Sequence, residues 1–498
     1  MINFFFRSLS KNIFLLLTRL TNWKNNNEDF KDLNFKQNDF INYKVIKSYM
    51  VKENFVLNNS ITDIHTFNFL SFFQKLGGKK GIELSKENIF LWFKKYKYFN
   101  NFPWSGDLSS KRLINIIYTY DFICSISNQK EINSINHIIQ FHIKRINFEI
   151  KLKKTEDLSS YEILSLVLIE CSRKKNLNKT INKIKDIIDH QLDEISMHKS
   201  YNILEHAKFL NNLIEIKNIF LFIDLKIPKF VNNSILAMTS LLATYKHDDL
   251  SIPLFNGSNN NHNKEIQNIF KKEQFLKTSS LRNFKNGIAA YKDTNKSLFF
   301  NVVKPTNFEY HRELSAGTLA IEISANGEKI ITNCGWIEGS GKNLAYLKYS
   351  AAHSTIIINN TNISEIKDGE INIPFPREVL FENVDNDERT TFSGSHNGYL
   401  NNFRKICKRE ITIDRKKNIF IGEDTIMSTT SNIEKTVFHI RFHLMPEIAT
   451  TITENKKNII IRTKEDNIWM FKSDNEIMIE KSIFVRNDRA IETAQIVI

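Results

Sequence analysis

A short segment in the second half of the chain carries side chains suited to proton transfer. Tyr346 and Tyr349 precede His353, and Lys348 lies between the two tyrosines. A tyrosine can carry a proton at neutral pH when a cationic neighbour lowers its pKa, and Lys348 or His353 can be that neighbour. His353 itself can neutralise a carboxylate, act as a general base or bind a metal ion. The alternatives are aromatic packing at a loop edge for the tyrosines and a hydrogen-bonded structural role for the histidine.

A second group of polar side chains lies on one predicted strand, residues 435–444. His439, Arg441 and His443 alternate there with hydrophobic residues and therefore share one face. An arginine beside a histidine can bind a carboxylate in a two-pronged contact. We therefore expect Arg441 and His443 to bind substrate. A polar outer face of a sheet is the alternative, and it is the better interpretation of His439.

The elements that must position these groups differ between the two halves of the chain. From about residue 60 to about residue 250, apolar residues recur at helical spacing, and the links between the segments are short and polar. Consecutive helices with short links form antiparallel hairpins, in a closed ring or an open bundle. Helices are predicted at residues 109–127, 131–150, 161–174, 180–195, 202–225 and 234–245.

The period of the pattern changes after a polar stretch, GSNNNHNK at residues 257–264, which is the predicted domain boundary. From about residue 285 apolar and polar residues alternate with period two, and residues 325–327 form a turn between two such segments. Many short strands separated by turns indicate a sandwich. Strands are predicted at residues 317–324, 329–332, 354–359, 408–413, 418–421, 435–444, 458–463, 476–483 and 490–498.

Composition limits the class of protein. The chain has 498 residues, of which 41% are hydrophobic and 25% charged, so we expect two globular domains. The net charge of +14 can attract nucleic acid, anionic lipid or acidic polysaccharide. The basic residues are scattered, however, and no Lys/Arg tract with interleaved aromatic residues occurs. General over-use of Asn, Lys and Ile, as AT-rich coding DNA produces, is the other explanation of the charge.

The cysteines and the N-terminus carry little functional information. None of the four cysteines forms a C-x-x-C pair, which argues against a disulfide framework and a thiolate zinc site. The apolar run at residues 13–17 is too short to span a bilayer and is an unconvincing signal peptide. We predict an amphipathic helix there, with Arg7, Lys11 and Arg19 on its polar side.

Several motifs, in the right order along the chain, resemble the heparinase II/III-like family, specifically its alphaproteobacterial branch. The segment SAGTLAIEIS (315–324) is similar to the family's HAGTLSFE-type strand. ITNCG (331–335) is similar to its VNCG or VDSG strand end, and SAAHSTIII (350–358) to its TAAHST or AHNT segment. Further matching segments are FNFLSFFQKLGG (67–78), PWSGDLSSKRL (103–113), LFNG (254–257), HNGY (396–399), GED (422–424) and RFHLMP (441–446).

The resemblance implies a fold and a reaction. The implied fold is α+β multidomain, with an N-terminal α/α toroid of helical hairpins followed by a C-terminal antiparallel β-sandwich. The implied activity is that of a carbon–oxygen lyase acting on glycosaminoglycan-like polysaccharides by β-elimination next to a uronic acid. That reaction needs a group that neutralises the uronate, a base for the carbon-bound proton and an acid for the departing oxygen.

The same resemblance assigns roles to residues and also reveals departures. His353 matches the family's AHST histidine, and Asn333 can donate a hydrogen bond to a substrate carboxylate, although a turn-forming Asn before Gly is the alternative. Ser315 stands where the family has histidine, and Gly317 where one version has aspartate. Because these positions and Asn333 lack the ligands that hold a divalent ion in some relatives, we predict no zinc.

Three further candidates follow from the same resemblance. His311, four residues before Ser315, can compensate for the missing histidine, unless it is an exposed loop residue. The segment MHKSYNILEH (197–206) occupies the place of the family's GGHxSRxP-type residues, so His198 and Tyr201 are candidates to bind substrate.

We therefore predict an N-terminal extension (1–59), a helical domain (60–255), a linker (256–284) and a β-domain (285–498), with a cleft between the two domains. The predicted function is lyase cleavage of a uronate-containing acidic polysaccharide, without a cofactor. A non-catalytic carbohydrate-binding or cell-envelope polysaccharide assembly protein is the main alternative, because of Ser315. Nucleic-acid binding is a third reading, disfavoured by the scattered charge. We expect the cell envelope or periplasm, or the cytoplasm, as the compartment.

Overall fold

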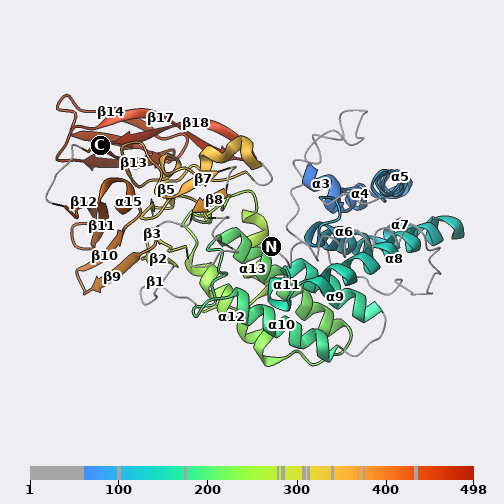
Figure 1. Cartoon of the computed structure of the whole chain (residues 1–498). Coiled ribbons are helices and arrows are strands. Elements are labelled where there is room, and N and C mark those ends of the chain that lie inside the picture. Colours follow the sequence, from blue (N-terminus) through green and yellow to red (C-terminus); the bar gives the residue numbers. More distant parts are fainter. Residues whose placement is uncertain are drawn as a thin grey trace. The chain divides into compact units, whose positions relative to one another are not determined.

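The structure is a computed structural model of the chain (Figure 1). The predicted N-terminal amphipathic helix and His311 lie outside the residues that it describes. Those residues are 61–97, 102–172, 177–276, 280–281, 287–305, 310, 314–337, 341–367, 370–373, 376–430 and 436–498.

The chain divides into two compact units that do not coincide with the predicted ranges. One unit comprises residues 1–191 and 209–235, and the other residues 192–208 and 236–498. The short segment 192–208, which carries His198 and Tyr201, thus belongs to the unit that contains the strands. The domain ranges given above stay a prediction.

The N-terminal region is helical (Figure 1). Helix α8 begins at a capping box, in which the Asn128 side chain accepts from the Glu131 N–H and the Glu131 carboxylate accepts from the Asn128 N–H. The predicted helix at residues 109–127 is two helices, because Thr119 leaves helical geometry and its hydroxyl donates to the Asn115 carbonyl (2.7 Å). The helices are α3 Ile61–Thr66, α4 Phe69–Leu76, α5 Gly78–Tyr96, α6 Gly106–Tyr118, α7 Tyr120–Cys124, α8 Gln129–Leu152, α9 Ser160–Ser172, α10 Asn178–Gln191, α11 Ile203–Phe222, α12 Lys229–Thr244 and α13 Asn263–Lys272.

In the first unit an arginine is buried between aromatic rings, an arrangement called the aromatic box below. Arg112 on α6 is fully buried, and its guanidinium carbon lies 4.0 Å from the ring centroid of Trp92 and 4.9 Å from that of Trp104. Its Nε donates to His142 Nε2 (2.7 Å), and its Nη1 donates to the His65 carbonyl. None of the described carboxylates pairs with it, so aromatic faces and neutral acceptors alone stabilise this cation.

We expect Arg112→Lys to destabilise the protein by at least about 2–4 kcal/mol, because lysine lacks the planar fork and leaves buried acceptors unpaired. Denaturant unfolding of the whole chain measures the loss. Lys111→Arg, one residue away, is the control: Lys111 is partly exposed and paired with Asp107, so that change should cost less than about 1 kcal/mol. Equal losses in the two variants would contradict the role of the aromatic box.

The C-terminal part consists of antiparallel sheets, as predicted (Figure 1). The largest sheet has nine strands: eight follow the order β1-β2-β3-β4-β5-β13-β18-β17, and β6 pairs with β13. Three smaller sheets have four strands (β12-β11-β10-β9), three strands (β14-β15-β16) and two strands (β7-β8). The strands are β1 Ser280–Leu281, β2 Gly287–Lys292, β3 Lys296–Val302, β4 Ile321–Ala325, β5 Glu328–Thr332, β6 Ile356–Ile358, β7 Glu365–Lys367, β8 Glu370–Ile373, β9 Val379–Asp385, β10 Arg389–His396, β11 Lys405–Asp414, β12 Ile419–Ser428, β13 Phe438–Leu444, β14 Ala449–Ile452, β15 Asn458–Arg462, β16 Ile468–Lys472, β17 Met478–Arg486 and β18 Arg489–Val497.

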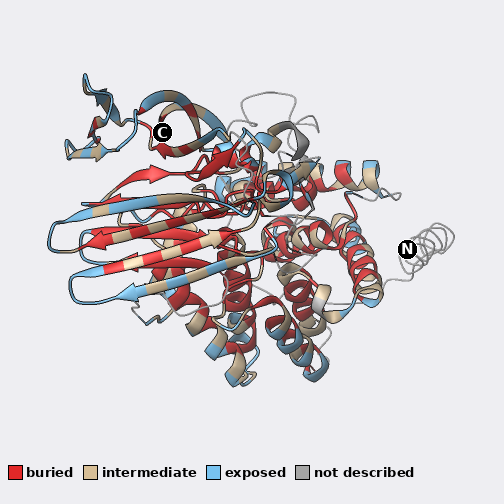
Figure 2. Cartoon of the chain, turned by 60° about the vertical axis from the view of Figure 1, so that its left-hand side comes forward, coloured by how far each residue is buried: buried red, intermediate tan, exposed pale blue. Residues whose placement is uncertain are grey.

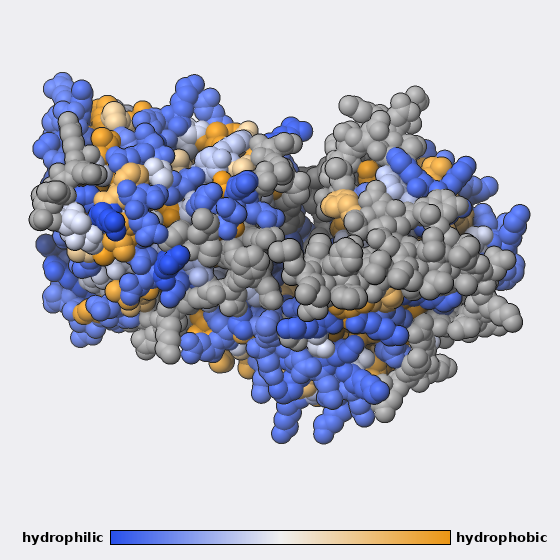
Figure 3. All heavy atoms as spheres, viewed as in Figure 1, coloured by the Kyte–Doolittle hydropathy of each residue, from blue (hydrophilic) through white to orange (hydrophobic). Residues whose placement is uncertain are grey.

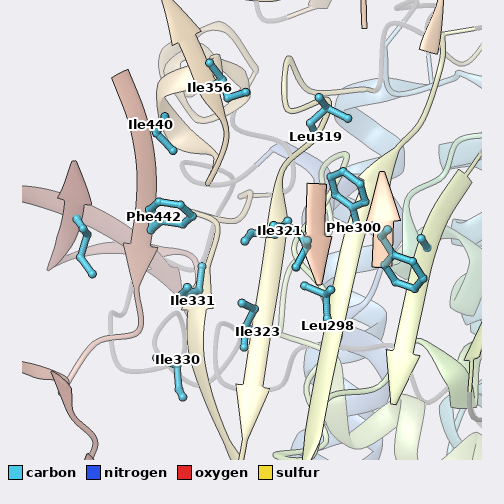
Figure 4. Close-up of a cluster of buried hydrophobic side chains, with 14 of the residues drawn as sticks. Leu298, Phe300, Leu319, Ile321, Ile323, Ile330, Ile331, Ile356, Ile440 and Phe442 are labelled. Carbon is cyan, nitrogen blue, oxygen red and sulfur yellow. The ribbon is translucent and has the colours of Figure 1, made fainter. Parts of the chain in front are cut away.

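The core of the second unit is made by one face of the largest sheet. Side chains of β3, β4, β5 and β13 point toward one another there, among them Phe300, Ile321 and Phe442 (Figure 4). Burial alternates along β10 and β11, whose inward residues join this core (Figure 2). The opposite face of the largest sheet is therefore free to carry polar groups, and the candidate site uses it.

Several hydrophobic side chains are exposed, and Ile460, Ile468 and Met470 lie together on one face of the sheet β14-β15-β16. Val384, Ile468 and Met470 are more than half exposed, but on the face seen in Figure 3 the hydrophobic side chains form small groups among hydrophilic ones. Among the described helices, none has the length and apolar character that crossing a membrane requires.

One local expectation was wrong. The predicted strand 317–324 begins only at Ile321, because Leu319 has a positive φ of 60° and Asn301 Nδ2 takes the Gly317 carbonyl (2.9 Å). Residues at the start of the predicted linker are buried: Asn256, Ser258 and Asn259 are 1%, 0% and 1% exposed. Their side chains satisfy buried backbone groups, which composition alone does not distinguish from contact with water.

Candidate functional site

His353 has the properties of a ligand-binding side chain. It follows the single turn Ser350–Ala352 and precedes β6, and it is only 3% exposed. Neither ring nitrogen has a hydrogen-bond partner among the described residues. Burial lowers its pKa to about 4, so the imidazole is neutral at pH 7 and offers one donor and one acceptor. A buried polar group without a partner is costly unless a ligand or water satisfies it.

Gly317 is required by the position of this ring. A Cβ atom at residue 317 would lie 2.7 Å from His353 Cγ, closer than side chains approach. An aspartate at this position would displace the imidazole. Ser315 lies in the same loop, 8% exposed, and the loop is fixed to the His353 segment by two hydrogen bonds: Ala316 N donates to the Lys348 carbonyl (2.8 Å) and Ser350 Oγ donates to the Ala316 carbonyl (2.7 Å).

Asn333 is engaged within the protein. It is fully buried, its Nδ2 donates to Glu322 Oε1 (3.0 Å), and its Oδ1 accepts from the Ser354 N–H (2.9 Å). The amide therefore holds the residue next to His353 in place. In this arrangement neither end of the amide is directed at a ligand.

His443 and Arg441 lie on the polar face of β13, as their alternation predicts. The His443 N–H donates to Ser354 Oγ (2.9 Å), which places this strand directly beside the His353 segment. His443 Nδ1 lies 2.7 Å from Ser482 Oγ, and burial with the neighbouring His353 lowers the pKa of His443 to about 3. Arg441 Nη1 donates to Glu480 Oε2 (2.7 Å), so a carboxylate of the protein already occupies part of its fork.

The two candidate tyrosines are the exposed part of the site. Tyr346 is 41% exposed and Tyr349 is 36% exposed. Tyr349 immediately precedes the turn that His353 follows, and its carbonyl accepts from the Ala352 N–H (2.9 Å). One short turn thus links an accessible phenol to the buried imidazole.

His198 and Tyr201 lie in the same unit, on the segment before α11. His198 is buried, its Nδ1 lies 2.8 Å from Ser200 Oγ, and burial lowers its pKa to about 4. Tyr201 is 5% exposed and its backbone has a positive φ of 50°. No hydrogen bond among the described residues joins either one directly to His353.

The residues that connect these pieces were missed by the sequence analysis. Glu322 on β4 is fully buried and accepts from Lys329 Nζ (2.8 Å), His247 Nε2 (2.9 Å) and the Leu254 N–H (3.0 Å). A charged residue at one position of an otherwise apolar strand, with a lysine on the returning strand, was the available signal.

The loop after Ile252 links this carboxylate to the segment of Tyr201. Asn256 Nδ2 donates to the Tyr201 carbonyl (3.2 Å), and Ser258 Oγ accepts from the Ile203 N–H (3.0 Å) while donating to Asn202 Oδ1 (3.0 Å). The first residues of the predicted linker therefore connect these two segments.

A divalent ion does not fit the residues around His353. Ser315 is a weak ligand, Gly317 has no side chain, and Asn333 Oδ1 is used by the Ser354 N–H. No cluster of three or more His, Cys, Asp or Glu side chains suited to a metal occurs in the described part of the chain. We derive no chemical step through a metal.

Comparison with known proteins identifies the fold. Residues 279–498 match the sequence model of the family described as heparinase II/III-like, C-terminal. A crystal structure of heparinase III superposes with a TM-score of 0.71 at 12% identity, covering 98% of this chain and 86% of that chain. The heparinase III-BT4657 gene product superposes with a TM-score of 0.62 at 12% identity, covering 97% of this chain and 85% of that chain. The heparan sulfate lyase HepC from Pedobacter heparinus superposes with a TM-score of 0.56 at 12% identity, covering 88% of this chain and 73% of that chain.

A curated protein of another class also matches in sequence. The DNA-directed RNA polymerase subunit beta' of Oedogonium cardiacum is 26% identical over 311 residues, which are 58% of this chain; this chain spans 14% of that protein's length. The structural matches extend over nearly the whole chain and decide the fold. The protein has a heparinase III-like fold.

Proposed function

We propose that this protein, with its heparinase III-like fold, is a polysaccharide lyase that cleaves a uronate-containing acidic polysaccharide by β-elimination. The buried imidazole of His353, with both nitrogens unpartnered among the described residues, carries the proposal. A polar group from outside the protein is the natural partner for such a ring. We also propose that the helices form an α/α toroid and that the antiparallel sheets form a β-sandwich. The assignment to the alphaproteobacterial branch rests on the sequence motifs alone.

The reaction assigns tasks to His353 and to the two exposed tyrosines. A base removes the proton from the carbon next to the uronate carboxyl group. The electron pair of that C–H bond forms a carbon–carbon double bond, the bond to the glycosidic oxygen breaks, and an acid protonates that oxygen. His353 is neutral, so it can donate a hydrogen bond to the uronate or accept the proton, but it does not supply a positive charge. Tyr349 or Tyr346 is the proposed proton carrier at the solvent side.

The hydrogen bonds of the other predicted site residues change the roles that we propose for them. Asn333 is assigned a supporting role, because both ends of its amide are used inside the protein. Arg441 is retained as a binding residue through its Nε, which is buried without a partner among the described residues, although Glu480 compensates part of its charge. His443, His198 and Tyr201 are retained as candidates to bind substrate.

A non-catalytic carbohydrate-binding or envelope-polymer assembly protein is the second candidate. The features that favour it are Ser315 in place of the family histidine and the Glu480 carboxylate on Arg441. A binder needs polar and aromatic groups along a chain of sugars but no base at the reacting carbon.

The test is a panel of acidic polysaccharides, including heparan sulfate, chondroitin, hyaluronan and alginate, with ultraviolet absorbance reporting the unsaturated uronate. We expect one polymer to give a rising signal. Tyr349→Phe is expected to reduce kcat on that polymer by on the order of 100-fold, because the ring stays but the transferable proton is lost. Tyr346→Phe is the matched comparison, and whichever change leaves kcat intact excludes that tyrosine. Binding without any absorbance change would instead support the non-catalytic protein.

A further inference from the structure

We propose that Glu322 is the positioning centre of the site, holding the segment of His353 with one carboxylate oxygen and a buried cation with the other. Glu322 touches no candidate substrate-binding atom, so it is a positioning residue and not a catalytic one. The inference rests on the proposed function only where activity is the readout.

The two oxygens have different partners. Oε1 accepts from the Asn333 N–H (3.2 Å), from Asn333 Nδ2 (3.0 Å) and from the Leu254 N–H (3.0 Å). Oε2 accepts from Lys329 Nζ (2.8 Å) and His247 Nε2 (2.9 Å). Oε1 therefore fixes two separate segments, and Oε2 accepts from the Lys329 ammonium and from the neutral His247 ring.

Each backbone contact leads to a candidate site residue. Through Asn333, Oε1 reaches the Ser354 N–H and so fixes the residue that follows His353. Through Leu254 it fixes the loop in which Asn256 holds the Tyr201 carbonyl. Loss of this acceptor should loosen both segments together, although they are far apart in the sequence.

A register shift between β4 and β5 places the Lys329 ammonium beside Glu322. Ile323 pairs with Ile331 but Ser324 pairs with Lys329, so β5 has an extra residue, Ile330. This bulge turns Lys329 away from the core face and toward Glu322. Burial opposes ionisation of Glu322, but Lys329 and His247 lower its pKa to about 2, so it remains a carboxylate. Lys329 Nζ also donates to the Ile252 carbonyl (3.1 Å).

Two variants separate hydrogen bonding from charge. In Glu322→Gln the new amide oxygen can take the place of Oε1, but its NH2 group then faces the Lys329 ammonium and the His247 N–H, so donors meet without an acceptor. Adding Lys329→Met removes the ammonium. His247 can then change tautomer, accepting from the amide at Nε2 and donating from Nδ1 to Ser324 Oγ, 2.9 Å away.

Glu162→Gln is the matched control. Glu162 is also fully buried, and it accepts from Lys153 Nζ (2.7 Å) and the Ser159 N–H (2.9 Å) in the other unit. It therefore reports the general cost of altering a buried Glu–Lys pair.

The experiment measures hydrogen exchange of the peptides containing Ser354 and Tyr201, together with kcat and KM on a polymer that the parent protein cleaves. For Glu322→Gln we expect faster exchange in both peptides and a kcat reduced by on the order of 100-fold, the cost of displacing a reacting group by about 1 Å. The double variant should regain at least on the order of tenfold in kcat and slow the exchange again. The control should do neither.

Unchanged exchange at Ser354 and unchanged kcat in a folded Glu322→Gln protein would overturn the inference. So would equal changes in Glu162→Gln. Lys329→Met also removes the donor to the Ile252 carbonyl, so the Ser354 peptide is the one that decides if Glu322→Gln does not fold. Normal exchange there in the double variant supports the inference, and fast exchange there overturns it. If the parent protein cleaves no polymer, the lyase proposal fails, and the exchange data alone still judge the role of Glu322.

Discussion

Replacing His353 by glutamine is expected to reduce the release of unsaturated uronate by on the order of 10²- to 10⁴-fold, the usual contribution of one proton-transferring group. Glutamine has similar length and can donate a hydrogen bond, but it cannot accept the proton. The imidazole is buried, neutral and without partners among the described residues, so its removal should leave the surrounding hydrogen bonds intact. Initial rates on the cleaved polymer measure the effect.

His396→Gln is the matched control for that change. His396 is also buried, 2% exposed, and its Nε2 likewise has no partner in the described part of the chain. Its Nδ1 accepts from the Gly398 N–H (3.0 Å), so its role is local. We expect the control to retain activity. An active His353→Gln protein would make His353 structural and favour the non-catalytic function.

Acidification is expected to unfold the protein between about pH 6.5 and about pH 4, the range in which buried histidines would have to become charged. In the unfolded chain a histidine titrates near pH 6.5, whereas burial depresses its pKa in the folded protein. Between the two values the unfolded state binds more protons, so stability falls as the pH falls. The pKa is lowered to about 4 at His65, His198, His206, His247 and His353, to about 3 at His396 and His443, and well below 6.5 at His142.

Denaturant unfolding across this pH range measures the effect. Each such histidine adds up to about 1.4 kcal/mol per pH unit to the slope. Glu322 acts in the same direction, because its lowered pKa contributes stability that is lost only as the pH falls below its unfolded value. His396→Gln should reduce the slope by up to one histidine's share. A free energy of unfolding that is constant down to pH 5 would contradict the burial of these rings.

Much of the secondary structure could be predicted because it depends on local patterns. The predicted helix 131–150 appears as α8 with its cap at Asn128, and the predicted strand 490–498 appears as β18. The segment 317–324 was predicted less well, since a side chain distant in sequence, Asn301, donates to the Gly317 carbonyl and the backbone at Leu319 has a positive φ. Alternation cannot reveal such a competitor.

The candidate site shows the same division. The sequence by itself determined that His353 stands beside Tyr349 and that Arg441 and His443 share a strand face, because neighbours in sequence and the two-residue period of a strand fix such relations. Only the tertiary structure decided that Asn333 serves the protein's own backbone, that Glu480 meets Arg441, and that a bulge turns Lys329 toward Glu322. These relations join segments brought together by folding, and burial then makes each unpaired or paired polar group energetically decisive.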